Sequence, residues 1–197
     1  MPTPERTSRE AIVAAGSDLL EIAGLEGLTM QAVAERVGVR APSLYKRVRN
    51  RDELVGLIAR ATIDELGARL DAAAAGRPGD ARAALRRLAR VARAFAHERP
   101  AGFRLIFAPA TDAALARDSL AAASAPLLRV AASLAGEGHA LHAARTFTAW
   151  LNGFASMELA GAFRLGGDVD EAFEFGLERL TDAIARADGE AQAAAIG

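Results

Sequence analysis

Residues 29–54 read TMQAVAERVGVRAPSLYKRVRNRDEL, and this stretch carries the signals of two short helices joined by a tight turn. Thr29 can cap the first helix, because its hydroxyl can accept a hydrogen bond from a first-turn backbone amide. Gly38 can end that helix, since glycine readily adopts the left-handed conformation that closes a helix C-terminus. Pro42 suits the first position of the second helix, where no amide hydrogen is needed. The stretch therefore predicts a helix-turn-helix.

The same stretch contains a run of cations uninterrupted by any acid, whereas the whole chain has a net charge of −1. The six cations are Arg36, Arg40, Lys46, Arg47, Arg49 and Arg51. The positive field is therefore local, which is typical of a small nucleic-acid contact surface. Small and cationic residues on one face of the second helix are suited to lying against bases and phosphates in a major groove.

Composition favours an all-α protein. The chain has 197 residues, of which 51% are hydrophobic and only 5% aromatic, and alanine is abundant, which favours closely packed helices. The absence of cysteine from the sequence excludes disulfides, thiolate zinc sites and a cysteine nucleophile. The polar N-terminus does not resemble a signal peptide, and no apolar run approaches the ~20 residues of a membrane span. We therefore expect a cytoplasmic protein without a membrane segment.

Apolar spacing and breaker residues predict about nine helices in two domains. Asn50 and Glu53 predict a capping box at the start of a long helix. We expect a three-helix DNA-binding domain over residues 1–53 and a helical bundle over residues 54–197. Outside the helix-turn-helix, the expected helices cover about 8–23, 54–75, 85–98, 101–107, 112–135, 139–163 and 168–187.

The N-terminal part resembles the DNA-binding domain of the TetR family of bacterial transcriptional regulators. The residues that match are Gly24 to Thr29, Gly38-Val39, Leu44-Tyr45 and the stretch Asn50 to Leu54. The family commonly has His-Phe shortly after the Leu-Tyr pair, whereas this chain has Arg47-Val48 there. The segment from Trp150 to Gly161 resembles the C-terminal domain of a subgroup marked by a Trp-His-Gly element, with Asn152 in place of the histidine.

This resemblance implies a ligand-responsive regulator, a repressor that a small organic effector releases from double-stranded operator DNA. It also implies that the helical bundle over residues 54–197 is an effector-binding and dimerisation domain. Because one recognition helix reads few base pairs, we expect a homodimer on a palindromic operator. The bases would be read by Arg40, Ser43 and Lys46, with Ala41 and Pro42 touching a thymine methyl. Phosphate or backbone contacts are expected from Thr29, Tyr45 and Arg51, whereas Arg47 suits either a base edge or a phosphate.

Two further sets of residues are predicted in the C-terminal domain. Polar and aromatic side chains could line an effector cavity: Phe95, His97, Phe103, Phe107, Trp150, Asn152, Phe154 and Met157. The helix over 139–163 is apolar on two faces, and the second face, rich in small residues, suggests a partner subunit. The residues expected at that dimer interface, with those of the last helix, are Gly153, Ala160, Gly161, Phe173, Leu177, Leu180 and Ile184.

Two alternatives compete with this interpretation. An enzyme built on a helical bundle is disfavoured by the lack of a recognisable nucleophile–base pair or phosphate loop, and we predict no cofactor. His139 and His142 lie three residues apart without a clear third ligand, so no metal site is predicted. The other alternative is a helical-bundle protein whose C-terminal domain binds a small molecule or a protein without DNA-binding function.

Overall fold

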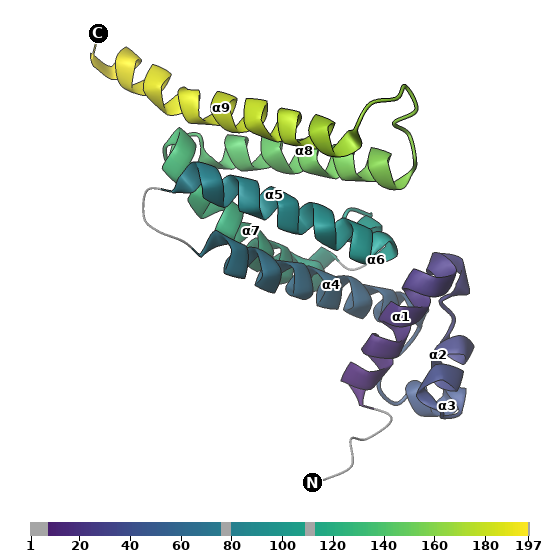
Figure 1. Ribbon diagram of the computed structural model, residues 1–197. Helices are drawn as coiled ribbons and strands as arrows, with labels where there is room; N and C mark the ends of the chain where they lie inside the picture. The colour runs from purple at the N-terminus through teal and green to yellow at the C-terminus, as the bar shows by residue number, and fades with distance from the viewer. Residues whose placement is uncertain (1–7, 76–79, 109–112, 197) are drawn as a thin grey trace. The chain divides into compact units, whose positions relative to one another are not determined.

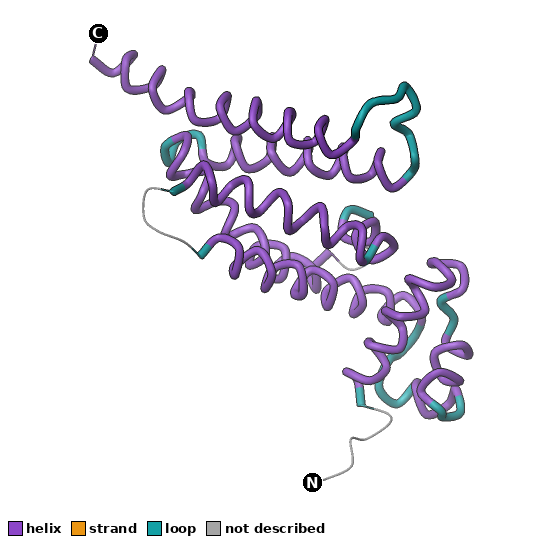
Figure 2. Tube along the Cα trace, in the orientation of Figure 1, coloured by secondary structure: helices purple, strands orange, loops and turns teal. Residues whose placement is uncertain are grey.

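A computed structural model describes residues 8–75, 80–108 and 113–196, except for the side chains of 113–117 and 187–196. Over these residues the chain forms nine helices and no strand (Figure 1, Figure 2), which confirms the predicted all-α class. The helices are α1 (Arg9–Gly27), α2 (Met30–Val37), α3 (Ala41–Leu44), α4 (Arg51–Ala74), α5 (Ala81–Glu98), α6 (Pro100–Ile106), α7 (Ala113–Ala135), α8 (Ala140–Leu159) and α9 (Val169–Ile196).

The helices fall into two compact units, which we call the headpiece and the bundle. The headpiece comprises Met1–Glu65 and Arg99–Ala121, and the bundle comprises Leu66–Glu98 and Ala122–Gly197. These units divide the chain elsewhere than the predicted boundary between residues 53 and 54. The first part of α4 and the whole of α6 belong to the headpiece, although α6 follows α1 by more than 70 residues.

The headpiece core forms where α1, α2, α3 and α4 each contribute buried apolar side chains. The buried cluster consists of Ile12, Leu20, Leu28, Met30, Val33, Ala34, Leu44, Val48, Leu54 and Ile58. Helix α6 adds to it, because Ala101 and Leu105 pack against the same cluster. Burying each large aliphatic side chain contributes about 1.5–3 kcal/mol. This core fixes the short helix α3 on the other helices of the headpiece.

Helix α1 is longer than expected and bent. Ser8 caps it, its Oγ accepting a hydrogen bond from the Ala11 amide at 3.1 Å. Gly24 was expected to end the helix, but the chain bends there through a left-handed residue (φ 67°) and continues helically to Gly27. The glycine therefore kinks the element without ending it.

In the bundle, α9 lies beside both α5 and α8 (Figure 1). The largest fully buried side chains of this unit come from all three helices: Leu85, Leu88 and Phe95 of α5, Phe147 of α8, and Phe173 and Leu177 of α9. Trp150 of α8 packs flat against α9, since a Cβ added at Gly176 would meet its Cζ2 atom at 2.9 Å. A glycine is therefore needed where the indole crosses α9.

Helices α8 and α9 differ in length from the predictions. Helix α8 ends at Leu159 instead of about residue 163, and Gly161 follows with a positive φ of 61°. Helix α9 runs to Ile196 instead of about residue 187. Between them, Gly166 and Gly167 also have positive φ values of 83° and 86°, so glycines shape this connection.

Among the described helices, none is by itself long and apolar enough to cross a membrane. Asp118–Ala135 and Ala140–Leu159 meet the length and composition criteria only as a pair, and they are bent by 118° at the break between them.

Candidate DNA-binding surface and effector domain

The turn between α2 and α3 has the geometry that its residues predict. The Thr29 Oγ1 atom accepts a hydrogen bond from the Ala32 amide at 3.1 Å and caps α2. Gly38 ends α2 in the left-handed conformation (φ 79°), and its amide donates to the carbonyls of Ala34 and Glu35. Arg40 precedes α3 with extended backbone angles, and Pro42 lies in the first turn. Caps and turn thus hold α3 at a fixed angle to α2.

One side of α3 is buried and the other is exposed. Leu44 and Val48 are almost wholly buried in the headpiece core. The exposed side chains are Arg40, Pro42, Tyr45, Lys46 and Arg47, and those of Ala41 and Ser43 are half-buried. Helix α3 itself spans only four residues, and the chain continues in turns, the Arg47 amide donating to the Leu44 carbonyl at 2.8 Å. The exposed side of this short element joins cationic, hydroxyl and small groups, as a DNA-contacting surface requires.

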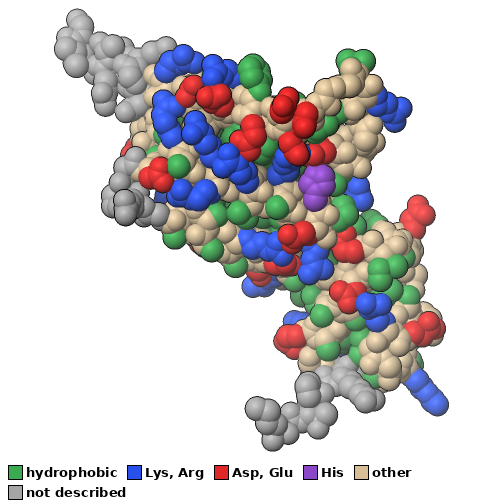
Figure 3. Space-filling model, in the orientation of Figure 1, with side chains coloured by type: hydrophobic (Ala, Val, Ile, Leu, Met, Phe, Trp, Pro, Cys, Tyr) green, Lys and Arg blue, Asp and Glu red, His purple; other side chains and the backbone are tan. Residues whose placement is uncertain are grey.

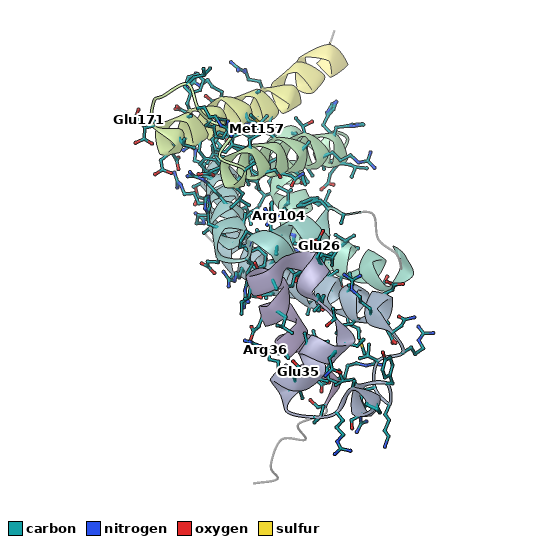
Figure 4. All side chains as sticks on the ribbon, turned by 90° about the vertical axis from the view of Figure 1, so that its right-hand side faces the viewer. Glu26, Glu35, Arg36, Arg104, Met157 and Glu171 are labelled. Carbon is teal, nitrogen blue, oxygen red and sulfur yellow. The ribbon has the colours of Figure 1, made fainter. Side chains whose placement is uncertain are left out.

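The six cations of the basic run have different surroundings. Arg36 pairs with Asp18 of α1 at 2.8 Å (Figure 4 labels Arg36 on α2). Arg49 contacts the Glu53 carboxylate through its Nε atom at 3.2 Å. Arg40 and Lys46 are exposed on the surface of α3 and the turn after it. The cations available to phosphates are therefore fewer than the sequence alone suggests.

Arg51 differs from its expected role. Its Nε atom donates to the Leu28 carbonyl at 2.7 Å, and its Nη2 atom donates to the Leu25 carbonyl. These carbonyls lie at the corner between α1 and α2, where the last turn of α1 leaves its acceptors without helical partners. The guanidinium therefore ties this corner to the start of α4, and the predicted contact of Arg51 with the DNA backbone is not part of this arrangement.

The predicted capping box of α4 forms with a shift of one residue. The Asn50 Oδ1 atom accepts from the Glu53 amide at 2.9 Å, as expected. The Glu53 carboxylate reaches back to the Arg49 amide at 2.6 Å, one residue before the cap. This hydrogen bond lowers the pKa of Glu53 below its usual value, and the Arg49 side chain adds to the effect. The charged carboxylate therefore fixes the link between the recognition element and α4.

Comparison with known proteins agrees with this geometry. A model of the bacterial regulatory proteins of the tetR family matches residues 12–58, and a model of the tetracyclin repressor-like C-terminal domain matches residues 85–180. An uncharacterized HTH-type transcriptional regulator of Mycobacterium tuberculosis, Rv0681, is 30% identical over 80% of this chain and 73% of its own length. The chain belongs to the TetR family.

Solved structures of similar proteins have the TetR-family fold along nearly the whole chain. A possible TetR family transcriptional regulator from Streptomyces coelicolor A3(2) has a TM-score of 0.70 at 25% identity and covers 90% of this chain and 98% of its own. A protein of unknown function from Rhodococcus sp. RHA1 has a TM-score of 0.79 at 25% identity, covering 94% and 99%. This TetR-family member is a ligand-responsive, DNA-binding transcriptional regulator. The Trp-His-Gly subgroup stays a prediction.

The predicted effector-binding residues do not form one group. Phe103 and Phe107 lie on and just after α6 in the headpiece, with ring centroids 5.3 Å apart. Trp150 and Phe154 belong to an aromatic cluster of the bundle, where each packs against Phe173, at 5.4 and 5.3 Å respectively. Among the others, Phe95 is fully buried, Asn152 is half-buried, and His97 and Met157 are exposed.

An ionic cluster beside these aromatic rings escaped the sequence analysis. The Arg93 guanidinium of α5 donates to the Glu158 carboxylate of α8, pairs with Asp170 of α9 at 2.6 Å, and lies 4.5 Å from the Phe173 ring centroid. The His97 Nε2 atom is 3.1 Å from Glu158. The hydrogen bond from Arg93 lowers the pKa of Glu158, which therefore stays ionised in the folded chain. A local sequence motif cannot predict this cluster, because its members come from three separate helices.

The predicted dimer residues divide into an outer and an inner group. Gly153, Ala160 and Gly161 are exposed. By contrast, Phe173, Leu177 and Ile184 are buried within the bundle, and Leu180 is half-buried. The inner residues of α9 are covered by this same chain, because α9 packs on α5 and α8. They are therefore not available to a second copy in this arrangement.

The headpiece also carries an open groove of about 600 Å³ lined by α1, α4 and the start of α6. Val13, Leu20, Leu57 and Ile58 supply apolar lining, and acidic and basic side chains surround it. No spacing pattern in the sequence indicated this groove. Over the described residues, no group of three or more His, Asp or Glu side chains is arranged to hold a metal ion.

Proposed function

We propose that the protein is a homodimeric repressor that binds a palindromic operator and leaves it when a small organic molecule binds the bundle. The observation that carries this proposal is the exposed surface of α3, where Arg40 and Lys46 flank the half-buried Ser43 on an element fixed by a buried core. A rigid element that presents donors to solvent is suited to reading base edges. The alternative without DNA binding is not favoured, because the basic surface is intact.

We assign the contacts of this surface by chemistry. Arg40, Ser43 and Lys46 would read bases, with Ala41 and Pro42 against a thymine methyl. Tyr45, whose side chain is 53% exposed, would donate its hydroxyl to a phosphate. The N-terminus of α2 at Thr29 would bind another phosphate through its backbone amides. Arg47 would contact DNA at a base or a phosphate, and Arg51, whose Nε and Nη2 atoms bind carbonyls between α1 and α2, would offer its Nη1 atom to the DNA backbone.

We propose that the second copy packs on the outer faces of α8 and α9. Met157 of α8 (labelled in Figure 4) is 48% exposed, and Phe175 of α9 is 67% exposed. Gly153 lies on the exposed side of α8 between turns that carry other small residues, which lets a partner helix approach closely. This face replaces the buried residues of α9 that the sequence had suggested.

The effector would bind in the bundle near the aromatic cluster. Trp150, Asn152 and Phe154 remain candidates, because each is half-buried and the cluster offers both ring faces and a polar amide. Phe103 and Phe107 belong to the headpiece, and their predicted contact with the effector stays a prediction. The proposal includes a cytoplasmic location, because the operator DNA of a bacterial regulator lies there.

The test begins with selection of a binding sequence from a random DNA pool by the full chain, followed by fluorescence anisotropy on the selected duplex over a salt series. We expect tight, sequence-selective binding whose log–log slope changes by about −0.9 for each phosphate contact. The double variant Arg40→Ala/Lys46→Ala should lose this binding. The control variant Arg104→Ala, which removes an exposed cation of α6 (Figure 4), should keep it. Equal, weak binding to selected and scrambled DNA would refute the proposal.

A further inference from the structure

The start of α6 is held by a residue of α1. Helix α6 has no local side-chain cap: Arg99 precedes it without capping, and Pro100 has no amide hydrogen. The next two amides instead donate to Glu21, Ala101 to Oε2 at 2.9 Å and Gly102 to Oε1 at 2.8 Å. A carboxylate at a helix N-terminus is favoured both by its charge and by the free amides. One side chain of α1 thus supplies the cap of a helix 80 residues further on.

The contact leaves no room between the three helices at this point. A Cβ added at Gly102 would lie 3.1 Å from the Glu21 Oε1 atom and 3.1 Å from the Thr62 Cγ2 atom of α4. The backbone of α6 therefore approaches α1 and α4 as closely as a glycine permits. Any shift of the first turn of α6 must change the contact with Glu21, because this carboxylate accepts from two of its amides.

A groove lies beside the contact. Glu21 and Gly102 both line the 600 Å³ groove of the headpiece. Because Glu21 lines this groove, its carboxylate can leave the amides of α6 without entering the buried core. The contact can therefore open and close while the headpiece keeps its fold.

Helix α6 is joined almost directly to the bundle. Helix α5 ends at Glu98 and α6 begins at Pro100, so a single residue separates them. The two junction residues have opposite charges, and each pairs with an oppositely charged residue of α4. Glu98 accepts from Arg69 at 2.6 Å, and Arg99 lies 3.7 Å from Glu65. A displacement at the end of α5 therefore reaches the amides held by Glu21 within three residues.

Helix α1, which carries Glu21, also packs against the recognition element. Ile12 and Leu20 of α1 share one buried cluster with Leu44 and Val48, which anchor α3 and the turn after it. The Arg9 Nη2 atom also donates to the Arg47 carbonyl at 3.2 Å. Helix α1 thus packs against the element that would contact DNA, at the same time as Glu21 holds α6.

We propose that Glu21 is a latch: its carboxylate holds the first turn of α6 on α1, and a change of state in the bundle reaches the DNA-binding surface by opening this contact. The inference rests on the proposed function. The closed latch favours operator binding, because it fixes α1 behind the recognition element. Operator and latch then stabilise one another reciprocally. Glu21 is a positioning residue, since it contacts neither DNA nor effector.

The test uses the full chain, wild type and variants, with the duplex that the wild type selects from a random pool. Glu21→Ala removes the latch, Glu21→Gln keeps an acceptor without the charge, and Gly102→Ala crowds the contact. Glu26→Ala is the matched control, another glutamate of α1 whose side chain is exposed (Figure 4). Anisotropy gives the operator affinity, and hydrogen–deuterium exchange follows the amides of residues 101–106 with and without the duplex.

We expect about tenfold weaker operator binding for Glu21→Ala and a smaller loss for Glu21→Gln. The duplex should slow exchange over residues 101–106 in the wild type and in Glu26→Ala, but not in Glu21→Ala. A general loss of protection that includes α2 and α3 in free Glu21→Gln would overturn the latch and leave Glu21 a merely structural role. So would operator affinity within twofold of wild type in Glu21→Ala. If the wild type selects no sequence, the proposed function fails and the latch fails with it. If the wild type does select a sequence and the Glu21 variants bind it as the wild type does, the latch alone fails.

Discussion

Arginine has different roles in the headpiece and in the bundle. In the headpiece, Arg40 is exposed to solvent beside the recognition element. In the bundle, the arginines of α5 pair with carboxylates of α9 in antiparallel order: Arg82 with Asp182, Arg90 with Glu174, and Arg93 with Asp170. Figure 3 shows basic and acidic side chains interleaved over α5 and α9. The same residue type is therefore left exposed on the recognition element, whereas in the bundle a carboxylate of the neighbouring helix pairs with it.

The largest expected effect removes the exposed cations of the headpiece. Arg40→Ala/Lys46→Ala should weaken operator binding by on the order of 100-fold, because two base contacts are lost together. The thermal midpoint should stay within a few degrees of wild type, since both side chains are exposed. Arg82→Ala in the bundle is the control, and a similar loss of DNA binding in it would erase the distinction between the two regions.

The second effect removes the most enclosed cation of the bundle. Arg93→Ala should lower the free energy of unfolding by about 3 kcal/mol, because Glu158 would remain partly buried without its main partner. Arg90→Ala breaks an exposed pair and should lower it by at most about 1 kcal/mol. Urea unfolding followed by circular dichroism measures both variants. Equal losses of unfolding free energy in the two variants would mean that burial does not determine how much each ion pair contributes to stability.

The third effect concerns two glycines, Gly38 at the end of α2 and Gly56 inside α4. Gly38→Ala should destabilise the protein by about 1 kcal/mol, since residue 38 has a positive φ. Gly56→Ala should stabilise it by about 0.5–1 kcal/mol, because Gly56 lies inside α4 and a Cβ there would meet no atom within 4 Å. Thermal unfolding compares the two. Opposite signs are required, and a gain from Gly38→Ala would contradict the turn geometry.

The smallest effect is a dependence on pH in both regions. The pKa values of Glu53 in the headpiece and Glu158 in the bundle are lowered from the ordinary value of 4.5. The stability that each charged carboxylate contributes is therefore complete above about pH 4.5 and is lost as the pH falls through the lowered pKa. Unfolding by urea between pH 6 and pH 3 should show this decline, with a shallower slope in Glu53→Gln and in Glu158→Gln. A variant slope equal to that of wild type would exclude that residue as a source.

The sequence predicted the elements whose signals are local. Thr29, Gly38 and the Asn50–Glu53 pair each act within a few residues of their own position, so the helix-turn-helix could be read from spacing and caps alone. The all-α class followed from composition and apolar periodicity in the same way. The DNA-contacting residues remain predictions, but the exposure of Arg40, Tyr45 and Lys46 agrees with them.

The rest depended on contacts between distant segments. Periodicity identified Phe173 and Leu177 as a buried stripe, but it could not tell whether a second copy or this chain covers them. Arg51 carried the right charge for a phosphate, but the sequence did not show that two backbone carbonyls near the end of α1 also bind its Nε and Nη2 atoms. Aromatic residues alone did not reveal that Phe103 and Trp150 belong to different units.

The headpiece is discontinuous along the chain, since residues 99–108 complete a core that residues 8–65 begin. Hybrid regulators are commonly conceived as one DNA-reading segment joined to a foreign sensor at a single point. For this protein, a single join within α4 would leave α6 behind and pair α1 with whatever helix the foreign sensor supplies. A chimera that keeps the whole headpiece needs three joins, after Glu65, before Arg99 and after Ala121, and its sensor must accept an inserted segment of the headpiece.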